Sequence, residues 1–381
     1  MKTIMRMTEA SMNQSGMSVE RSRIASLGIP SLCRWLVTGV MLLAISVVGA
    51  PGEPSGDPAG FYRIDCLGNS DTVVSIPFGR PAAAHVVVES VVANMVTFKG
   101  TPGWTTDQFV YSSVAEPPQT NTYYIRFLSG AKEGRYFPVA GNGTNSVVLN
   151  LDGDDISAVT DGDLAAVIPY WTLATAFPES NGIFASPSML NRPTEILLPD
   201  LQGAGINLSA SKIYFFHAGI WKQVGQGNVS RNDDILLPDA YVIVRHNVAT
   251  NTVCTFMGEV LTSKIAIPLA VSADSKQDNF VSLARPTTLS LNESGLIDTG
   301  AFKVSESALN RQDELLVFNN AVAARNKSVS AIYYYLLNSG WRKVGSPDIV
   351  GDDLVFAPGA AVIIRKSTSS VVPVWINSAP Y

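Results

Sequence analysis

Charge is scarce in this sequence: Asp, Glu, Lys and Arg make up 15% of its 381 residues, whereas hydrophobic residues make up 46%. Disordered chains and polyelectrolyte tails have many charges and few apolar residues, so this composition excludes both classes. Turn-forming residues are plentiful instead, with 30 glycines and 22 prolines. The chain therefore has the apolar mass for a core, and its length predicts two or three domains of about 100 to 200 residues.

Histidine is also scarce, and the common catalytic motifs are missing. His85, His217 and His246 do not have the spacing of metal ligands, which argues against a zinc site or a catalytic triad. The chain has no Gly-x-Ser-x-Gly elbow, no phosphate-binding glycine loop with lysine and no Cys-x-x-Cys. We therefore expect no cofactor and favour a protein without catalysis, although a carboxylate pair such as Glu195 and Glu314 could act as acid and base without a motif.

One segment does match a catalytic motif. Residues 295–301 read Gly-Leu-Ile-Asp-Thr-Gly-Ala, the pattern of aspartic proteases, in which two aspartates share a proton and activate water. Residues 51–381 contain no second Asp-Thr-Gly or Asp-Ser-Gly. Because a match this short often arises by chance, we interpret Asp298 as part of a polar turn.

Cysteine is nearly absent, with three residues in the chain. Cys33 lies before an apolar run near the N-terminus, whereas Cys66 and Cys254 lie in the body of the chain. Two cysteines are too few for a disulfide framework. They could form one disulfide in an oxidising compartment or remain separate thiols, because the sequence does not give the distance between them.

The N-terminal 50 residues have the charge order of a secretory signal peptide. Residues 1–34 hold five basic and two acidic side chains, and the uncharged run of 16 residues from Trp35 to Ala50 follows. This run is shorter than the roughly 20 residues that a membrane-spanning helix needs, and it ends in small residues that signal peptidase accepts. We predict a signal peptide over 1–50 and a protein secreted or held in the cell envelope, with a permanent N-terminal anchor as the alternative.

Removal of the leader leaves an acidic protein. Residues 51–381 carry 22 basic and 30 acidic side chains, a net charge of -8, with no run of Lys or Arg. Nucleic acid is a poor partner for such a surface. The same residues contain no apolar run of membrane-spanning length, so we expect no stable membrane span in the mature chain.

Short runs rich in Val, Ile, Tyr and Phe alternate with turn residues over the rest of the chain. Examples are the runs at 123–127, 147–151, 213–216 and 332–335. No stretch keeps a period of 3.6 residues for more than about three turns, as a major helix would. The pattern predicts an all-β fold.

The chain also contains an internal repeat. Residues 191–197 (Asn-Arg-Pro-Thr-Glu-Ile-Leu) recur as 310–316 (Asn-Arg-Gln-Asp-Glu-Leu-Leu), and four further blocks follow in the same order at an offset of 119 or 120. These blocks begin at Ile213, Gly219, Asp233 and Val242 in the first copy. A period this long exceeds that of propeller blades and solenoids, so it indicates duplicated β domains.

These patterns give a predicted domain order. We expect a linker at 51–59, an N-terminal β barrel or sandwich module at 60–175, and two duplicated β-sandwich-like modules at 176–284 and 285–381. The segment that starts at Asp278 also resembles the segment that starts at Asp71. This similarity suggests that strands are exchanged or shared between modules.

Several segments carry a resemblance to a known group of proteins. They are residues 61–72, 132–136, 149–155 and 168–173, together with the doubled Gly and Trp segments at 219–225 and 340–345. In these segments the chain resembles an uncharacterised family of exported bacterial proteins of similar length. The resemblance covers essentially the whole mature chain and implies a secreted bacterial β protein, without an activity or catalytic residues.

Two sets of residues are candidates for binding. Asn150, Asp152, Asp154 and Asp161 fall at positions 1, 3, 5 and 12 of a calcium loop, but the glycine needed at position 6 is Asp155 and flanking helices are not expected. The loop therefore suggests either a calcium site or turns in which the acidic side chains bond the backbone.

The second set is aromatic and recurs in both copies: Trp221, Trp341, Tyr214 and Tyr333. Such rings form either a ligand platform or a plug in the core, because a buried Trp removes a large area from water. We expect an exported, non-catalytic structural or binding protein of the cell surface or the extracellular space, with a cell-surface component or a polysaccharide as partner. The alternative is an extracellular hydrolase acting on polysaccharide or peptide.

Overall fold

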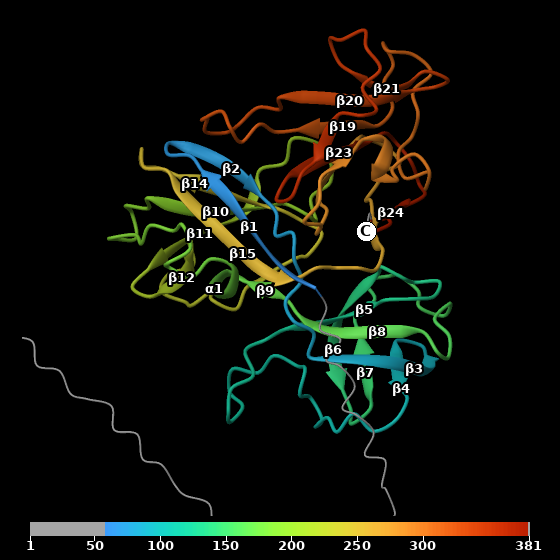
Figure 1. The fold of residues 1–381 in the computed structure, drawn as a ribbon. Coiled ribbons are helices and arrows are strands. Elements are labelled where there is room, and N and C mark those ends of the chain that lie inside the picture. Colours follow the sequence, from blue (N-terminus) through green and yellow to red (C-terminus); the bar gives the residue numbers. More distant parts are fainter. Residues whose placement is uncertain (1–57, 380–381) are drawn as a thin grey trace, which may run out of the picture. The chain divides into compact units, whose positions relative to one another are not determined.

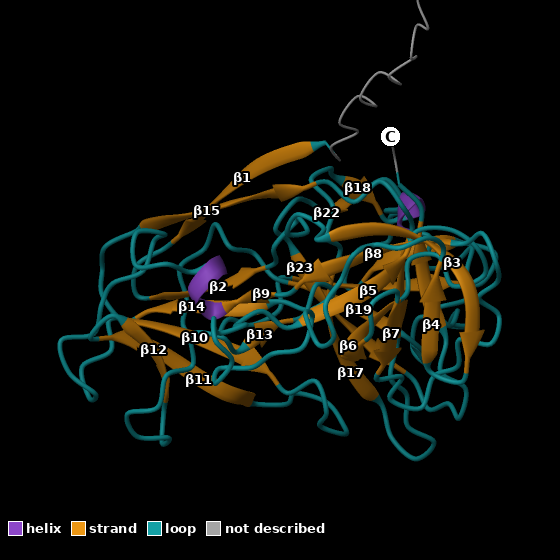
Figure 2. Cartoon of the chain, turned by 90° about the horizontal axis from the view of Figure 1, so that it is seen from below, coloured by secondary structure: helices purple, strands orange, loops and turns teal. Residues whose placement is uncertain are grey.

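The computed structural model describes residues 58–379 (Figure 1). The predicted signal peptide and most of the predicted linker lie outside the described residues. Within them, helix is limited to α1 (Leu173–Ala176) and the 3-10 helix η1 (Asn292–Ser294), and the remaining regular structure is strand (Figure 2). The predicted all-β fold is confirmed. Over this part of the chain no helix is long and apolar enough to cross a membrane.

The N-terminal β module is a closed barrel of six strands in the order β3-β4-β7-β6-β5-β8. The strands are β3 (Ala84–Val92), β4 (Met95–Phe98), β5 (Tyr123–Phe127), β6 (Tyr136–Asn142), β7 (Ser146–Leu149) and β8 (Leu164–Pro169). Apolar side chains that alternate along the strands fill the interior, and Val88, Phe98 and Ile125 are fully buried there. Closure leaves the barrel without free strand edges.

The first sheet unit is built around a five-stranded sheet with the order β12-β11-β10-β14-β2. Its strands are β2 (Ser70–Val74), β10 (Thr194–Pro199), β11 (Ala210–His217), β12 (Ile220–Gln223) and β14 (Val242–His246). Two antiparallel pairs complete the unit: β1 (Ala59–Cys66) with β15 (Thr252–Glu259), and β9 (Trp171–Thr172) with β13 (Ile235–Leu236).

The second sheet unit has the same parts. Its five-stranded sheet has the order β17-β23-β19-β20-β21, and two antiparallel pairs accompany it, β16 with β24 and β18 with β22. The strands are β16 (Ile265–Pro268), β17 (Gln277–Ser282), β18 (Leu289–Ser290), β19 (Glu314–Val317), β20 (Ala331–Leu336), β21 (Gly340–Lys343), β22 (Leu354–Phe356), β23 (Ala361–Lys366) and β24 (Val374–Asn377).

The two large sheets share their strand order, and their edge strands β2 and β17 form the same ion pair. Arg245 Nε lies 2.7 Å from Asp71 Oδ1 in the first sheet, and Arg365 Nε lies 2.7 Å from Asp278 Oδ1 in the second. β2 precedes the barrel in the chain, whereas its neighbour β14 follows it. The barrel therefore interrupts the first unit, while residues 283–288 alone join β17 to β18 in the second. The domain boundaries at 175 and 284 stay a prediction, and the strand pairing places residues 59–74 with the first sheet unit.

Each large sheet is also held by a loop of the other unit. Asn326 of the second unit donates its backbone N–H to Asp71 Oδ2 (2.7 Å), and its side-chain oxygen accepts from Arg245 (2.7 Å). Asn207 of the first unit makes the equivalent backbone contact with Asp278 (2.8 Å). Both asparagines have positive φ, at 48° and 56°, which asparagine tolerates better than most residues. These reciprocal contacts fix the position of one sheet unit on the other.

The barrel also contacts the chain that leads into the second unit. The backbone N–H of Ala266 donates to the Gly134 carbonyl (3.3 Å), and Lys264 forms an ion pair with Glu133 (2.9 Å). Gly134 has a φ of 87°, and a Cβ there would lie 2.7 Å from the Lys264 carbonyl oxygen. Glycine is therefore required for this close approach, which brings the barrel rim against the start of β16.

Candidate functional site

A pocket of about 520 Å³ lies where the barrel meets both sheet units. This volume falls in the range of roughly 300 to 1,000 Å³ that is typical of small-molecule sites. The barrel contributes residues around β6 and the acidic loop that follows β7, the first unit contributes the loop between β13 and β14, and the second unit contributes β16 and β24. The lining residues include Arg135, Tyr136, Phe137, Asn150, Asp152, Asp154, Tyr170, Leu237, Asp239, Ala266, Pro268, Val372 and Val374.

The polar floor of the pocket centres on Asp239. Tyr136, the first residue of β6, donates its hydroxyl hydrogen bond to Asp239 Oδ1 at 2.7 Å. The loop that carries Asp239 is held from the second unit, because the Ser282 backbone N–H donates to the Asp239 carbonyl (2.9 Å). One hydrogen bond therefore joins the barrel to a loop whose position depends on both sheet units.

Burial raises the pKa of the Asp239 carboxyl, and the hydrogen bond from Tyr136 and the charges of Arg126 and Arg135 oppose this shift. Burial and the Asp239 carboxylate also raise the pKa of Tyr136 well above its usual value. The Tyr136 hydroxyl therefore stays protonated and remains a hydrogen-bond donor.

Tyr170 is the second notable group of the pocket. It is 1% exposed, and its hydroxyl has no hydrogen-bond partner among the described residues. Its ring packs against Tyr124, with 4.6 Å between the ring centroids, and against Tyr136 at 6.4 Å. A buried hydroxyl without a partner costs about 1 to 3 kcal/mol, so a ligand or water that bonded Tyr170 would recover this free energy.

A buried arginine lies beneath the same group of tyrosines. Arg126 pairs with Tyr136 across the barrel strands and is 2% exposed. Its Nε has no partner among the described residues, whereas its terminal Nη2 donates to the Gly134 carbonyl at 3.5 Å. Burial lowers the pKa of Arg126, while the charge of Asp239 partly offsets this effect. The pocket lining thus combines a carboxyl with phenol hydroxyls, and the guanidinium of Arg126 lies next to Tyr136 outside the lining.

The acidic loop contributes three of the four predicted calcium ligands, Asn150, Asp152 and Asp154, to the pocket lining. Asp154 is bound by Arg135 and by Lys132 (3.2 Å), and Asn150 Oδ1 accepts from the Asp152 backbone N–H (3.3 Å). Asp161 instead pairs with Lys99 at 2.8 Å, and it does not line the pocket. Among residues 58–379 no group of three His, Cys, Asp or Glu side chains could hold a metal ion. Basic side chains therefore bind two of the carboxylates that a calcium ion would need, those of Asp154 and Asp161, and the calcium site stays a prediction.

The predicted aromatic residues lie in the cores of the two sheet units. Trp221 and Trp341 are 0% and 1% exposed. Tyr214 and Tyr333 are also buried. Their hydroxyls donate to Asp234 (2.5 Å) and Asp353 (2.9 Å), which lie in the equivalent Asp-Asp turns of the two units. These four rings therefore do not form an exposed platform. They act as core plugs, the second of the two interpretations that the sequence allowed.

The three carboxylates considered for catalysis lie in a turn or bind an arginine. Asp298 is exposed in the turn after η1. Glu195 accepts from Arg192 (2.6 Å), and Glu314 accepts from Arg311 (2.7 Å), at equivalent places in β10 and β19. None of the three lines the pocket between the barrel and the two sheet units, which we call the junction pocket.

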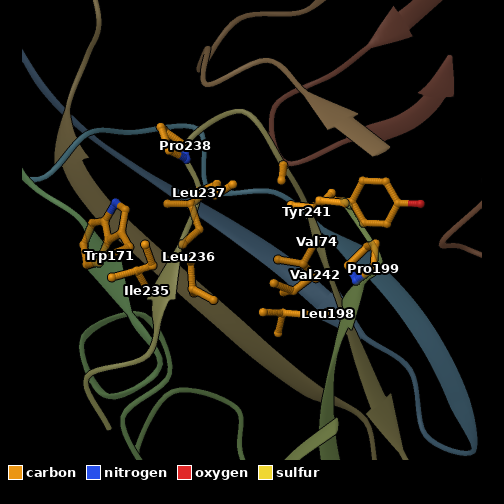
Figure 3. A pocket seen from close by; sticks show the side chains of 13 residues that line it. Val74, Trp171, Leu198, Pro199, Ile235, Leu236, Leu237, Pro238, Tyr241 and Val242 are labelled. Atoms are coloured by element: carbon orange, nitrogen blue, oxygen red, sulfur yellow. The ribbon is translucent and has the colours of Figure 1, made fainter. Parts of the chain in front are cut away.

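A second, apolar pocket lies within the first sheet unit (Figure 3). Val74, Leu198, Leu236 and Val242 line it, and Trp171 and Tyr241 lie at its sides. Its volume is about 60 Å³, whereas an apolar cavity that binds benzene measures about 150 Å³. We interpret it as a local packing defect.

Comparison of the chain with protein-family models, with curated proteins and with solved structures finds no match. The resemblance to an exported bacterial family therefore stays a prediction. Any functional argument depends on the pocket itself.

Sequence reasoning did not identify the residues of the pocket floor. Tyr136, Tyr170 and Asp239 are separated by 34 and 69 positions, and no motif connects them. Arg135, Tyr136 and Tyr170 lie in segments that carry the family resemblance, but nothing in those segments indicates a binding role. The site could be found only once the barrel had been placed against both sheet units.

Proposed function

We propose that the protein is an exported, non-catalytic bacterial binding protein that holds part of a polysaccharide or another cell-surface component in the junction pocket. The observation that carries this proposal is the pocket lining, in which Tyr170, whose buried hydroxyl has no partner within residues 58–379, lies with the hydrogen-bonded pair of Tyr136 and Asp239. Export and location in the cell envelope or outside the cell are parts of the proposal, supported by the charge order of residues 1–50.

The charges around the pocket favour an uncharged ligand. Asp152, Asp154 and Asp239 contribute three carboxyl groups. Three cations balance them: Arg135 in the lining, Lys132 on Asp154, and Arg126 beneath Tyr136. With the charges balanced, hydroxyl and carboxyl hydrogen bonds remain for recognition, and aliphatic side chains of β16 and β24 also line the pocket. Sugars combine hydroxyl groups with apolar ring faces and suit this mixture.

The repeated sheet unit supports a structural role alongside binding. We propose that the two units are duplicated copies of one β domain and that the barrel is inserted in the first. The shared strand order and the recurring Arg and Asp pair support this. The arrangement creates a junction that a single unit could not provide.

The test is calorimetric titration of the mature chain, from residue 51 on, with a panel of neutral oligosaccharides, uronic acid oligosaccharides and peptides. Asp239→Asn and Tyr170→Phe should each weaken binding of the recognised ligand by tenfold or more, since each removes about 1.4 kcal/mol or more of hydrogen bonding. Asp298→Ala, a change in an exposed turn outside the pocket, is the matched control and should bind as the wild type. Equal affinity in all four proteins would contradict the assignment of the pocket.

One observation favours the alternative, an extracellular hydrolase acting on polysaccharide or peptide. A general acid needs a raised carboxyl pKa, and burial raises the pKa of Asp239 in a pocket that also contains Asp152 and Asp154. Incubation of the same panel with the mature chain distinguishes the two functions. Turnover that Asp239→Asn abolishes would establish the hydrolase, and binding without turnover supports the binding protein.

A further inference from the structure

The two cysteines of the mature chain meet in the first sheet unit. Cys66 on β1 and Cys254 on β15 are 188 positions apart, yet their Sγ atoms lie 3.7 Å apart. Both are free thiols and both are 0% exposed. The 331 residues from position 51 on contain no other cysteine, so each thiol has the other as its sole possible intramolecular disulfide partner in the mature chain.

We propose that Cys66 and Cys254 are joined by a disulfide bond that forms when the exported chain folds. The inference rests on the export part of the proposed function, because stable disulfides form in oxidising compartments. It does not depend on the ligand of the junction pocket. The bond would tie the N-terminal strand β1 to β15, the two strands of one small sheet.

The strand register permits this bond after a small movement. Cys66 lies opposite Thr252 and Cys254 lies opposite Ile64, so the two cysteines are diagonal neighbours on one face of the pair. Diagonal Cα atoms are about 7 to 8 Å apart, slightly beyond the usual disulfide range of roughly 4.4 to 6.8 Å. The Gly79–Glu259 bridge lies at the end of the pair away from the cysteines, and next to Cys254 the β15 backbone is bound by a side chain, Asn181, rather than by a third strand. The pair can therefore close by this amount at the cysteines.

The chemistry is thiol–disulfide exchange with a disulfide oxidant, either a thiol–disulfide oxidoreductase or oxidised glutathione. One cysteine thiolate attacks the oxidant and forms a mixed disulfide, and one thiol of the oxidant leaves. The second cysteine then attacks the mixed disulfide and releases the other thiol. The two cysteines lose two protons and two electrons, and the oxidant becomes two thiols.

This exchange belongs to folding rather than to the folded state. In the folded chain both sulfur atoms are shielded from solvent. The hydrogen bond with Cys66 and burial also raise the pKa of the Cys254 thiol, and exchange requires a thiolate. The bond should therefore form before β1 packs onto the core of the first unit.

The first experiment counts thiols in native protein isolated from its source, denatured without reductant, and determines its N-terminal residue. We expect no reactive thiols, an intact mass lower by about 2 Da than that of the reduced chain, and an N-terminus near Pro51. Two reactive thiols with the leader removed would overturn the disulfide and leave export standing. Three reactive thiols, Cys33 included, with residues 1–34 present would overturn both.

The second experiment tests the geometry without export. The reduced, unfolded mature chain is refolded with oxidised glutathione, beside Cys66→Ser and Cys254→Ser. The wild type should give a monomer with no free thiol and no bound glutathione, whereas each single variant should retain one free thiol or one glutathione adduct. Glutathione adducts or disulfide-linked dimers as the main wild-type products would overturn the proposed bond.

Discussion

The two sheet units have different polar pairs at one equivalent buried position. In the first unit, Thr194 on β10 meets His246 at the end of β14, with Thr194 Oγ1 3.0 Å from His246 Nδ1. In the second unit the corresponding residues are Asp313, directly before β19, and Lys366 at the end of β23. These two residues form an ion pair. All four residues are at least 96% buried. The same β framework therefore accepts a neutral hydrogen bond or an ion pair, provided that both partners are present.

The difference shows which features define the sheet unit. Strand order and the ion pairs of Asp71 with Arg245 and of Asp278 with Arg365 recur in both units. The chemistry of the buried polar pair does not recur. A buried polar group needs a partner but not a particular one, so this position can change as a pair without changing the fold.

Breaking the ion pair of the second unit should have the largest effect on stability. Asp313→Ala leaves the Lys366 ammonium buried without its carboxylate, which should lower the free energy of unfolding by about 3 to 5 kcal/mol. Thr194→Ala at the corresponding place removes a neutral hydrogen bond and should cost about 1 to 3 kcal/mol. Urea unfolding followed by tryptophan fluorescence measures both.

The double variant Asp313→Thr with Lys366→His transfers the polar pair of the first unit to the second. It should recover most of the stability that Asp313→Ala loses, because a neutral pair replaces an unpaired charge. A double variant as unstable as Asp313→Ala would show that the two positions are not interchangeable.

The pH dependence of the two units should also differ. Burial lowers the pKa of His246 from 6.5 to about 4, so the folded state binds fewer protons than the unfolded state between these values. Stability from this group is fully present above pH 6.5 and is lost as the pH falls toward 4, by roughly 3 kcal/mol in total.

Urea unfolding at a series of pH values between 7 and 4 checks this expectation. Asp239, whose raised pKa acts in the opposite direction, is present in every protein compared. The control His246→Gln should therefore lose the histidine part of the slope and keep the rest. The same slope in wild type and His246→Gln would exclude His246 as its source.

The strands of the two sheet units could be predicted from the sequence, whereas the junction pocket could not. Alternating apolar residues predicted the strands, and the similarity of the segments at Asp71 and Asp278 suggested that strands are exchanged or shared between modules. β2 and β17 do lie at equivalent sheet edges. The junction pocket could not be predicted, because Tyr136, Tyr170 and Asp239 come together only through contacts between distant segments. The aromatic platform failed for a related reason, since a Trp after a turn does not reveal which face of its strand is buried.

The smallest predicted effect concerns how tightly each unit is packed. Val242 in the first sheet lines the apolar cavity of about 60 Å³, opposite Val74. Val362 has the corresponding place in the second sheet, opposite Val281, and is 1% exposed within the main core cluster of that unit. Val242→Ile adds one methylene to existing space and should stabilise the protein by up to about 0.8 kcal/mol. Val362→Ile adds the same group to a filled core and should destabilise it by about 1 to 3 kcal/mol. Thermal unfolding of both variants measures the contrast, and a loss of stability in Val242→Ile equal to that in Val362→Ile would mean that the first unit is packed as tightly as the second.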